Sequence, residues 1–257
     1  MPSVSMPASQ ALHSNAPTPY LGETVRPEAG ESSAWHTHAF GQITSALSGS
    51  MYVGTPDRVH LLCSAMAIWI PPDTRHWLRY GVRNEMIYVD VSREEAQHLG
   101  GNCRVVEMTP LLESLMTATV PAATPERSAA HIATLHTLLR QEFIATTDVP
   151  LSVVMPHDRR IIGVARRALE DPGEVGKSGD WLSGVAAGRK TIERLFVVET
   201  GMTPARWLRQ VRVLHAISRL AAGDKVSMVA LDMGYESTSA FSYMIRRTFG
   251  VCPSRFS

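Results

Sequence analysis

The feature that most limits the possible folds is a repeated pair of helices in the last third of the chain. Glycines stand where three predicted helices would end, at Gly201, Gly223 and Gly250. Pro204 begins a long helix that separates the two pairs. The apolar spacing predicts helices over 181–187, 189–200, 204–222, 226–233 and 237–249. This part of the chain should therefore form two helix-turn-helix units on one connecting helix.

Such a double unit suits double-stranded DNA. The major groove is about 12 Å wide and admits one α-helix, whose first residues reach the base edges. A connector of about 19 residues spans roughly 28 Å at about 1.5 Å per residue. Successive major-groove segments on one face lie about 34 Å apart, so the connector has a compatible length.

The distribution of charge supports this interpretation. The whole chain has a formal net charge of +1. Residues 1–156 hold 9 Lys and Arg against 14 Asp and Glu, a balance of −5, whereas residues 157–257 hold 16 against 10, a balance of +6. The positive part is the one that carries the helix pairs, as expected for a half that approaches phosphates.

These helices carry a family resemblance. Residues 230–256 resemble the second helix-turn-helix signature of the AraC/XylS transcriptional regulators, and residues 190–223 resemble the half that precedes it. The similarity extends from Trp181 to Phe256. It includes Gly234-Tyr235, Ala240-Phe241, Arg246-Arg247, Phe249-Gly250 and Pro253. The resemblance implies a DNA-binding transcription regulator with RNA polymerase as a partner, which acts as an activator or as a repressor of transcription.

The resemblance also implies that the two recognition helices read the bases. In the first, Ile192, Leu195 and Phe196 would be buried, and Arg189, Lys190, Glu193 and Arg194 would face DNA. In the second, the candidate readers are Thr238, Ser239, Ser242 and Tyr243. Arg246, Arg247 and Lys225 are expected at phosphates. The alternative is that these residues form solvated helix faces.

Two residues depart from the family pattern at the starts of helices. Gly188 stands where the family usually has a capping serine, and Lys225 where it often has serine or threonine. Asp224 is adjacent to Lys225 and is expected to cap the second short helix instead.

The front part of the chain is predicted to be rich in β-structure. Strand-length apolar runs recur about every ten residues, which is typical of a sandwich or small barrel. They lie at 43–47, 50–54, 58–63, 66–70, 76–80 and 86–91. Two helices should follow, over 110–118 and 125–145, the second with an apolar stripe that suits either its own barrel or a homodimer seam. We expect a flexible tail over 1–20, a sensor or dimerisation domain over 21–148, and a DNA-binding domain over 157–257.

Three histidines give the front part a second resemblance. His36-Thr37-His38 and the segment from Pro71 to His76 resemble the two motifs of the cupin barrels. The resemblance implies that His36, His38 and His76 point into the barrel, where they could hold iron, nickel, manganese or zinc. Gln42 stands in the position of the family's glutamate and is a poor ligand. The alternatives are hydrogen bonding within the barrel and an effector pocket that holds no metal.

A small organic or drug-like effector is the expected ligand of this barrel, since ligand sites are mostly apolar and aromatic with a few polar groups. The candidate effector pocket comprises His36, His38, Gln42, Trp69, His76 and Tyr88. Trp35, Tyr52 and Trp77 are further candidates for its lining.

The predicted protein is thus an α+β chain of two domains, a cupin-like barrel with flanking helices and an all-α double helix-turn-helix. We expect a regulator rather than an enzyme. The alternative is a metal-dependent cupin dioxygenase or isomerase that uses His36, His38 and His76. No apolar run approaches the roughly 18 residues of a membrane span, and the first residues do not resemble a secretory signal. A cytoplasmic location without a membrane partner is therefore expected.

Overall fold

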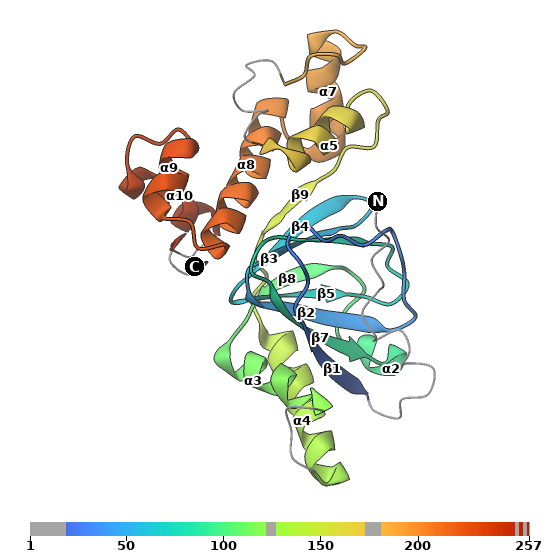
Figure 1. Ribbon diagram of the computed structural model, residues 1–257. Helices are drawn as coiled ribbons and strands as arrows, with labels where there is room; N and C mark the ends of the chain where they lie inside the picture. Colours follow the sequence, from blue (N-terminus) through green and yellow to red (C-terminus); the bar gives the residue numbers. More distant parts are fainter. Residues whose placement is uncertain (1–18, 122–126, 173–180, 250–251, 254–255, 257) are drawn as a thin grey trace.

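The computed structural model of the protein describes residues 19–121, 127–172, 181–249, 252, 253 and 256. A β-barrel forms the middle of the molecule, with α3 and α4 on one side and the C-terminal helices on the other (Figure 1). The strands are β1 (Tyr20–Val25), β2 (Gly41–Ser48), β3 (Ser50–Gly54), β4 (Arg58–Cys63), β5 (Met66–Ile70), β6 (Trp77–Tyr80), β7 (Glu85–Val91), β8 (Arg104–Glu107) and β9 (Ser152–Val154). The helices are α2 (Arg93–Ala96), α3 (Pro110–Ala118), α4 (Ala129–Ala145), α5 (Ile162–Glu170), α7 (Arg189–Thr200), α8 (Pro204–Ala221), α9 (Val226–Asp232) and α10 (Thr238–Phe249).

The barrel consists of two antiparallel sheets. One has the strand order β1-β7-β2-β5-β8 and the other β6-β3-β4-β9. The six strands predicted between residues 43 and 91 are confirmed as β2 to β7. Residues 1–18 of the predicted tail lie outside the described residues. Tyr20 was expected to end that tail but is the buried first residue of β1.

Each face of the larger sheet has its own core. Because successive side chains of a strand point to opposite faces, β5 sends Ile68 into the barrel and Trp69 outward, toward α3 and α4. On that outer face, Leu139 and Phe143 of α4 are fully buried. The apolar stripe predicted for this helix therefore packs partly on its own barrel. Ile132 and Leu138 belong to the same stripe and remain exposed.

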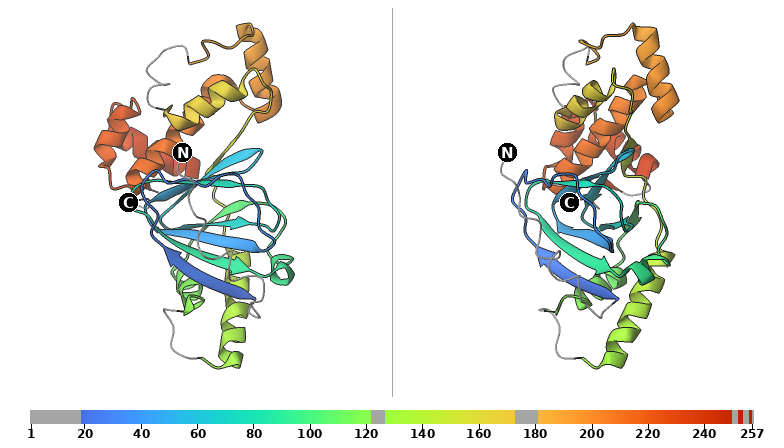
Figure 2. Two further views of the ribbon diagram at one scale, coloured as in Figure 1. Left: turned by 45° about the vertical axis from the view of Figure 1, so that its right-hand side comes forward. Right: turned by 90° about the vertical axis from the view of Figure 1, so that its right-hand side faces the viewer.

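The two halves of the molecule pack directly against each other (Figure 2). Residues 146–156 were expected to be an irregular linker, but they contain β9, which pairs with β4 between Arg58 and His60. Trp207 of α8 donates its indole N–H to the carbonyl of Val154 at 2.7 Å. Ser50 and Ser218 share a hydrogen bond of 2.7 Å between their hydroxyl groups. The chain that joins the halves is thus part of the barrel.

The helical half differs from its prediction in two places. Residues 181–184 form turns, so the short helix predicted over 181–187 is wrong. Lys225 is the N-cap residue of α9 and no side chain caps this helix. Asp224 was expected to cap it, but its carboxylate pairs with Arg219 at 2.7 Å instead. Among the described residues, no helix combines the length and the apolar character needed to cross a membrane.

Candidate functional site

The first recognition helix, α7, presents a charged face to solvent. Ile192, Leu195 and Phe196 are buried, as the helical period predicts. All four predicted DNA contacts of this helix are exposed: Arg189, Lys190, Glu193 and Arg194. Arg189 and Glu193 are one turn apart and form an ion pair of 3.3 Å. The other two cations of this face, Lys190 and Arg194, do not take part in this ion pair.

The second recognition helix, α10, presents a hydroxyl-rich face. Phe241 and Ile245 are fully buried, and the side chain of Ser237 accepts a hydrogen bond from the backbone N–H of Ala240. This cap escaped the sequence analysis. The predicted readers and phosphate contacts are exposed except for half-buried Ser242: Thr238, Ser239, Ser242, Tyr243, Arg246 and Arg247.

The long helix α8 holds α7 and α10 at its two ends (Figure 1). Trp207 fixes the α7 end, because its ring is stacked on Trp181 with centroids 5.9 Å apart and lies 5.6 Å from the ring of Phe196. Arg219 fixes the other end with ion pairs to Asp224 and Asp232. The 18 residues of α8 correspond to a rise of about 27 Å. The length of α8 is thus of the order of one turn of DNA.

The three histidines, His36, His38 and His76, lie close together in the segments that precede β2 and β6. The ring centroids lie 4.2 Å apart for His36 and His76 and 5.0 Å apart for His38 and His76. Each Nδ1 lies 2.6–2.9 Å from a backbone carbonyl, which can only accept, so Nδ1 carries the hydrogen. The pKa of His76 is lowered to about 4, chiefly by burial and also by His36 and His38, against the opposing hydrogen bond to the carbonyl of Thr74.

This cluster lacks the arrangement of a metal site. Within the ranges that the structure describes, no three His, Cys, Asp or Glu side chains are placed to hold an ion. The amide of Gln42, in the position of the cupin glutamate, donates to Asp90 at 2.7 Å. Gln42 is therefore not placed as a ligand, and a metal on His36, His38 and His76 stays a prediction.

The six residues expected to form an effector pocket do not surround one cavity. Trp69 lies on the outer face of its sheet, where its ring contacts Phe143 and its N–H donates to the carbonyl of Gly100. Tyr88 lies on the inner face and shares a 2.6 Å hydrogen bond with the hydroxyl of Tyr80. Strand alternation separates the two rings, and the sequence does not reveal this because both faces of β5 and β7 are buried.

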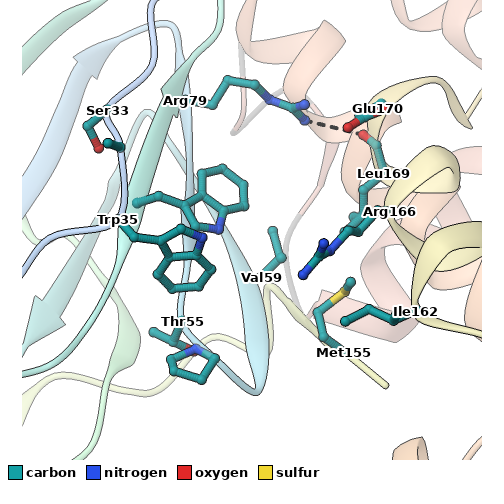
Figure 3. A pocket seen from close by; sticks show the side chains of 13 residues that line it. Ser33, Trp35, Thr55, Val59, Arg79, Met155, Ile162, Arg166, Leu169 and Glu170 are labelled. Carbon is teal, nitrogen blue, oxygen red and sulfur yellow. Dashed lines mark hydrogen bonds between the residues drawn. The ribbon is translucent and has the colours of Figure 1, made fainter. Parts of the chain in front are cut away.

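A different cavity lies between the barrel and α5, with a volume of about 360 Å³. Its apolar wall includes Trp35, Trp77 and Val59 from the barrel side and Ile162 and Leu169 from α5. Arg79 and Arg166 also line it, one from each half of the molecule (Figure 3). The sequence analysis named Trp35 and Trp77 but missed the α5 wall, because no motif links residues 33–79 to residues 155–170.

His60 makes stability depend on pH. The ring is buried, and its pKa is lowered to about 4, chiefly by burial and also by Arg58, with Asp57 opposing. An unfolded histidine has a pKa of about 6.5, so between these values the unfolded chain binds more protons. The contribution of His60 to the free energy of unfolding should therefore fall by about 2 kcal/mol from pH 7.5 to pH 5.

Urea unfolding at both pH values checks this expectation. The difference between pH 7.5 and pH 5 should shrink in His60→Met and stay unchanged in His131→Gln, which alters an exposed histidine of α4. An equal pH dependence in the wild type and His60→Met would contradict the assignment.

Comparisons with known proteins agree with the geometry of the C-terminal half. The family model described as a helix-turn-helix domain matches residues 182–257. The HTH-type transcriptional regulator NimR of Escherichia coli K12 is 25% identical over 221 residues, which cover 86% of this chain and 81% of that protein. ExsA of Pseudomonas aeruginosa is 32% identical over 80 residues, which cover 31% of this chain and 29% of that regulator.

Solved structures resemble the chain only distantly. ToxT from Vibrio cholerae has a TM-score of 0.36 at 11% identity, covering 93% of this chain and 98% of ToxT. A cupin from Shewanella frigidimarina has a TM-score of 0.27 at 15% identity, covering 28% of this chain and 66% of the cupin.

The two exposed recognition helices and the sequence matches define the class of protein, a DNA-binding transcriptional regulator. More particularly, residues 182–257 match a helix-turn-helix domain that is similar in sequence to those of NimR and ExsA, and a barrel of two antiparallel sheets precedes it.

Proposed function

We propose that this protein binds specific DNA sites as a regulator that responds to a small organic effector and acts in the cytoplasm. The observation that carries the proposal is the pair of exposed recognition faces on α7 and α10, held at the two ends of α8. Arg194 and Lys190 would contact guanine or phosphate, and Thr238 and Ser239 would contact base edges. An effector would act by binding more tightly to one of two arrangements of the halves.

Selection of bound sites from a random DNA pool, followed by footprinting on the selected site, tests this function. The purified full chain should protect two successive major-groove segments, with an affinity that falls steeply as salt rises. Metal analysis of the same preparation addresses the enzymatic alternative, the cupin dioxygenase or isomerase. Stoichiometric iron together with no footprint would overturn the regulator.

Arg194→Ala should weaken binding to the selected site by about 1–3 kcal/mol if the guanidinium reads a base. The side chain is exposed on α7, so folding should be unaffected. Titration of the selected and a scrambled site measures the effect, and the preference between them should decrease.

Arg246→Ala is the matched control, because Arg246 is an exposed cation near the end of α10 that we assign to a phosphate. It should weaken binding to both sites equally. If Arg194→Ala leaves the preference between the sites intact, Arg194 does not read a base.

We also propose that RNA polymerase is a partner in activation. A further part of the proposal is a homodimer formed through α3 and α4, on the outer side of the barrel. Leu111 of α3 and Ile132, Leu138 and Ile144 of α4 are large apolar side chains that remain exposed. The start of α4 projects beyond the barrel (Figure 1). Large apolar side chains that stay exposed on these two helices favour a protein interface on this side of the barrel.

Leu138→Glu should shift the protein toward monomers, because a charge would be buried at the interface. Sedimentation velocity measures the change across a concentration series. Thr137→Glu, an exposed neighbour on the same helix, is the control. A monomeric wild type, or dimers that persist in Leu138→Glu, would contradict this interface.

A further inference from the structure

The cavity between the barrel and α5 has the size and lining of a small-molecule site. Its volume of about 360 Å³ lies at the lower end of the range of ligand pockets, about 300–1,000 Å³. Trp35 and Trp77 meet edge to face with ring centroids 6.4 Å apart, and Trp35 is 41% exposed although its ring is large and apolar. An apolar or aromatic ligand body would cover this surface.

The polar groups of the cavity favour an anion. Arg79 donates to the carbonyl of Leu169 at 3.2 Å and stacks on the ring of Tyr52, so its guanidinium is held in place with donors to spare. Arg166 extends from α5 toward the barrel (Figure 3) and forms no hydrogen bond or ion pair with any described residue. Glu170 is the carboxylate in the lining, so two cations face one anion.

We propose that this cavity binds an aromatic monocarboxylate, with the carboxylate on Arg166 and the ring against Trp35 and Trp77. A guanidinium matches a carboxylate with two parallel hydrogen bonds. The excess of one positive charge suits a single carboxylate, and Glu170 disfavours a second one. This inference rests on the proposed function, since it names the chemical class of its effector and the place where the effector binds.

The position of the cavity gives the ligand a means of control. Its walls come from both halves of the molecule, with Arg79 on β6 and Arg166 on α5. A ligand that touches both halves binds this docked arrangement and stabilises it by RT ln(1 + [L]/Kd). Because α5 precedes the recognition helices in the same half, the acid should change the affinity for DNA.

Calorimetric titration of the full chain with benzoate, cinnamate and 2-naphthoate, and with their uncharged amides, tests the proposal. At least one acid should bind saturably, and its amide should bind at least tenfold more weakly. Arg166→Gln should weaken the acid about tenfold or more and leave the amide unchanged. Arg167→Gln is the matched control, because Arg167 is an exposed neighbour on α5 outside the cavity lining, and it should bind like the wild type.

Three results would overturn the proposal. The first is that no acid in the panel binds saturably. The second is that an acid and its amide bind with equal affinity. The third is that Arg166→Gln and Arg167→Gln weaken acid binding equally. Footprints recorded without acid separate this failure from that of the proposed function. A footprint in the absence of any acid binding would contradict only the proposed ligand. Acid binding without any footprint would contradict the proposed DNA-binding function.

Discussion

Trp207→Ala should lower the free energy of unfolding by about 3–5 kcal/mol, the range for truncating a buried tryptophan. The ring is fully buried and lies against Trp181 and Phe196, so its loss would leave a cavity beneath α7. The carbonyl of Val154 would also lose its hydrogen-bond donor. Urea unfolding measures the change, and DNA titration near physiological temperature should show binding lost along with the folded helical half.

Two further variants separate the causes. Trp207→Phe keeps an aromatic ring and removes the indole N–H, so it should cost about 1–2 kcal/mol. Val198→Ala truncates a side chain of α7 that is 70% exposed and should change stability by less than about 0.5 kcal/mol. A loss below about 1 kcal/mol in Trp207→Ala would show that this ring does not support α7.

Gly49→Ala should destabilise the protein by about 3 kcal/mol. Gly49 has a φ of +79°, a conformation that costs an L-residue about 1–2 kcal/mol. An added Cβ would also lie 2.6 Å from the carbonyl oxygen of Val82 and 2.9 Å from that of Arg83. These atoms belong to the backbone, so the two turns must move apart, at a cost of about 1–3 kcal/mol.

Gly30→Ala is the control for this variant. Gly30 has a φ of +76°, and a Cβ added there would meet no atom within 4 Å. Its cost should be about 1 kcal/mol, from the backbone conformation alone. Thermal unfolding of both variants measures the difference between their losses of stability. Equal losses would mean that the contact with residues 82 and 83 relaxes freely.

Most of the barrel could be predicted because turn residues separate its strands. Glycines or prolines mark the ends of β2, β3, β5 and β6, so the positions of these strands follow from local sequence. The short strands β8 and β9 were not predicted. They have four and three residues, and they are strands because they pair with β5 and β4, which local sequence does not show.

The candidate site divides in the same way. The exposed face of α7 could be predicted, because helical spacing places Ile192 inside, and that of α10 was expected from the family resemblance. The cavity at Arg166 could not, because its walls come from two distant segments of the chain, residues 33–79 and 155–170. Trp69 was expected to line the effector pocket, but its face could not be predicted, since a strand that is buried on both sides has no polar alternation to show which side chains point inward.

The pairing of β9 with β4 has a consequence for any attempt to divide this protein. A fragment that starts at residue 157 would lack the carbonyl groups of Val154 and Ser152, which accept from Trp207 and Gln210 of α8. A fragment that ends at residue 148 would expose the edge of β4, and unpaired edges promote aggregation. The helical half is therefore best produced with residues 149–156 attached. The barrel also requires these residues, so neither half is complete when the chain is cut between them.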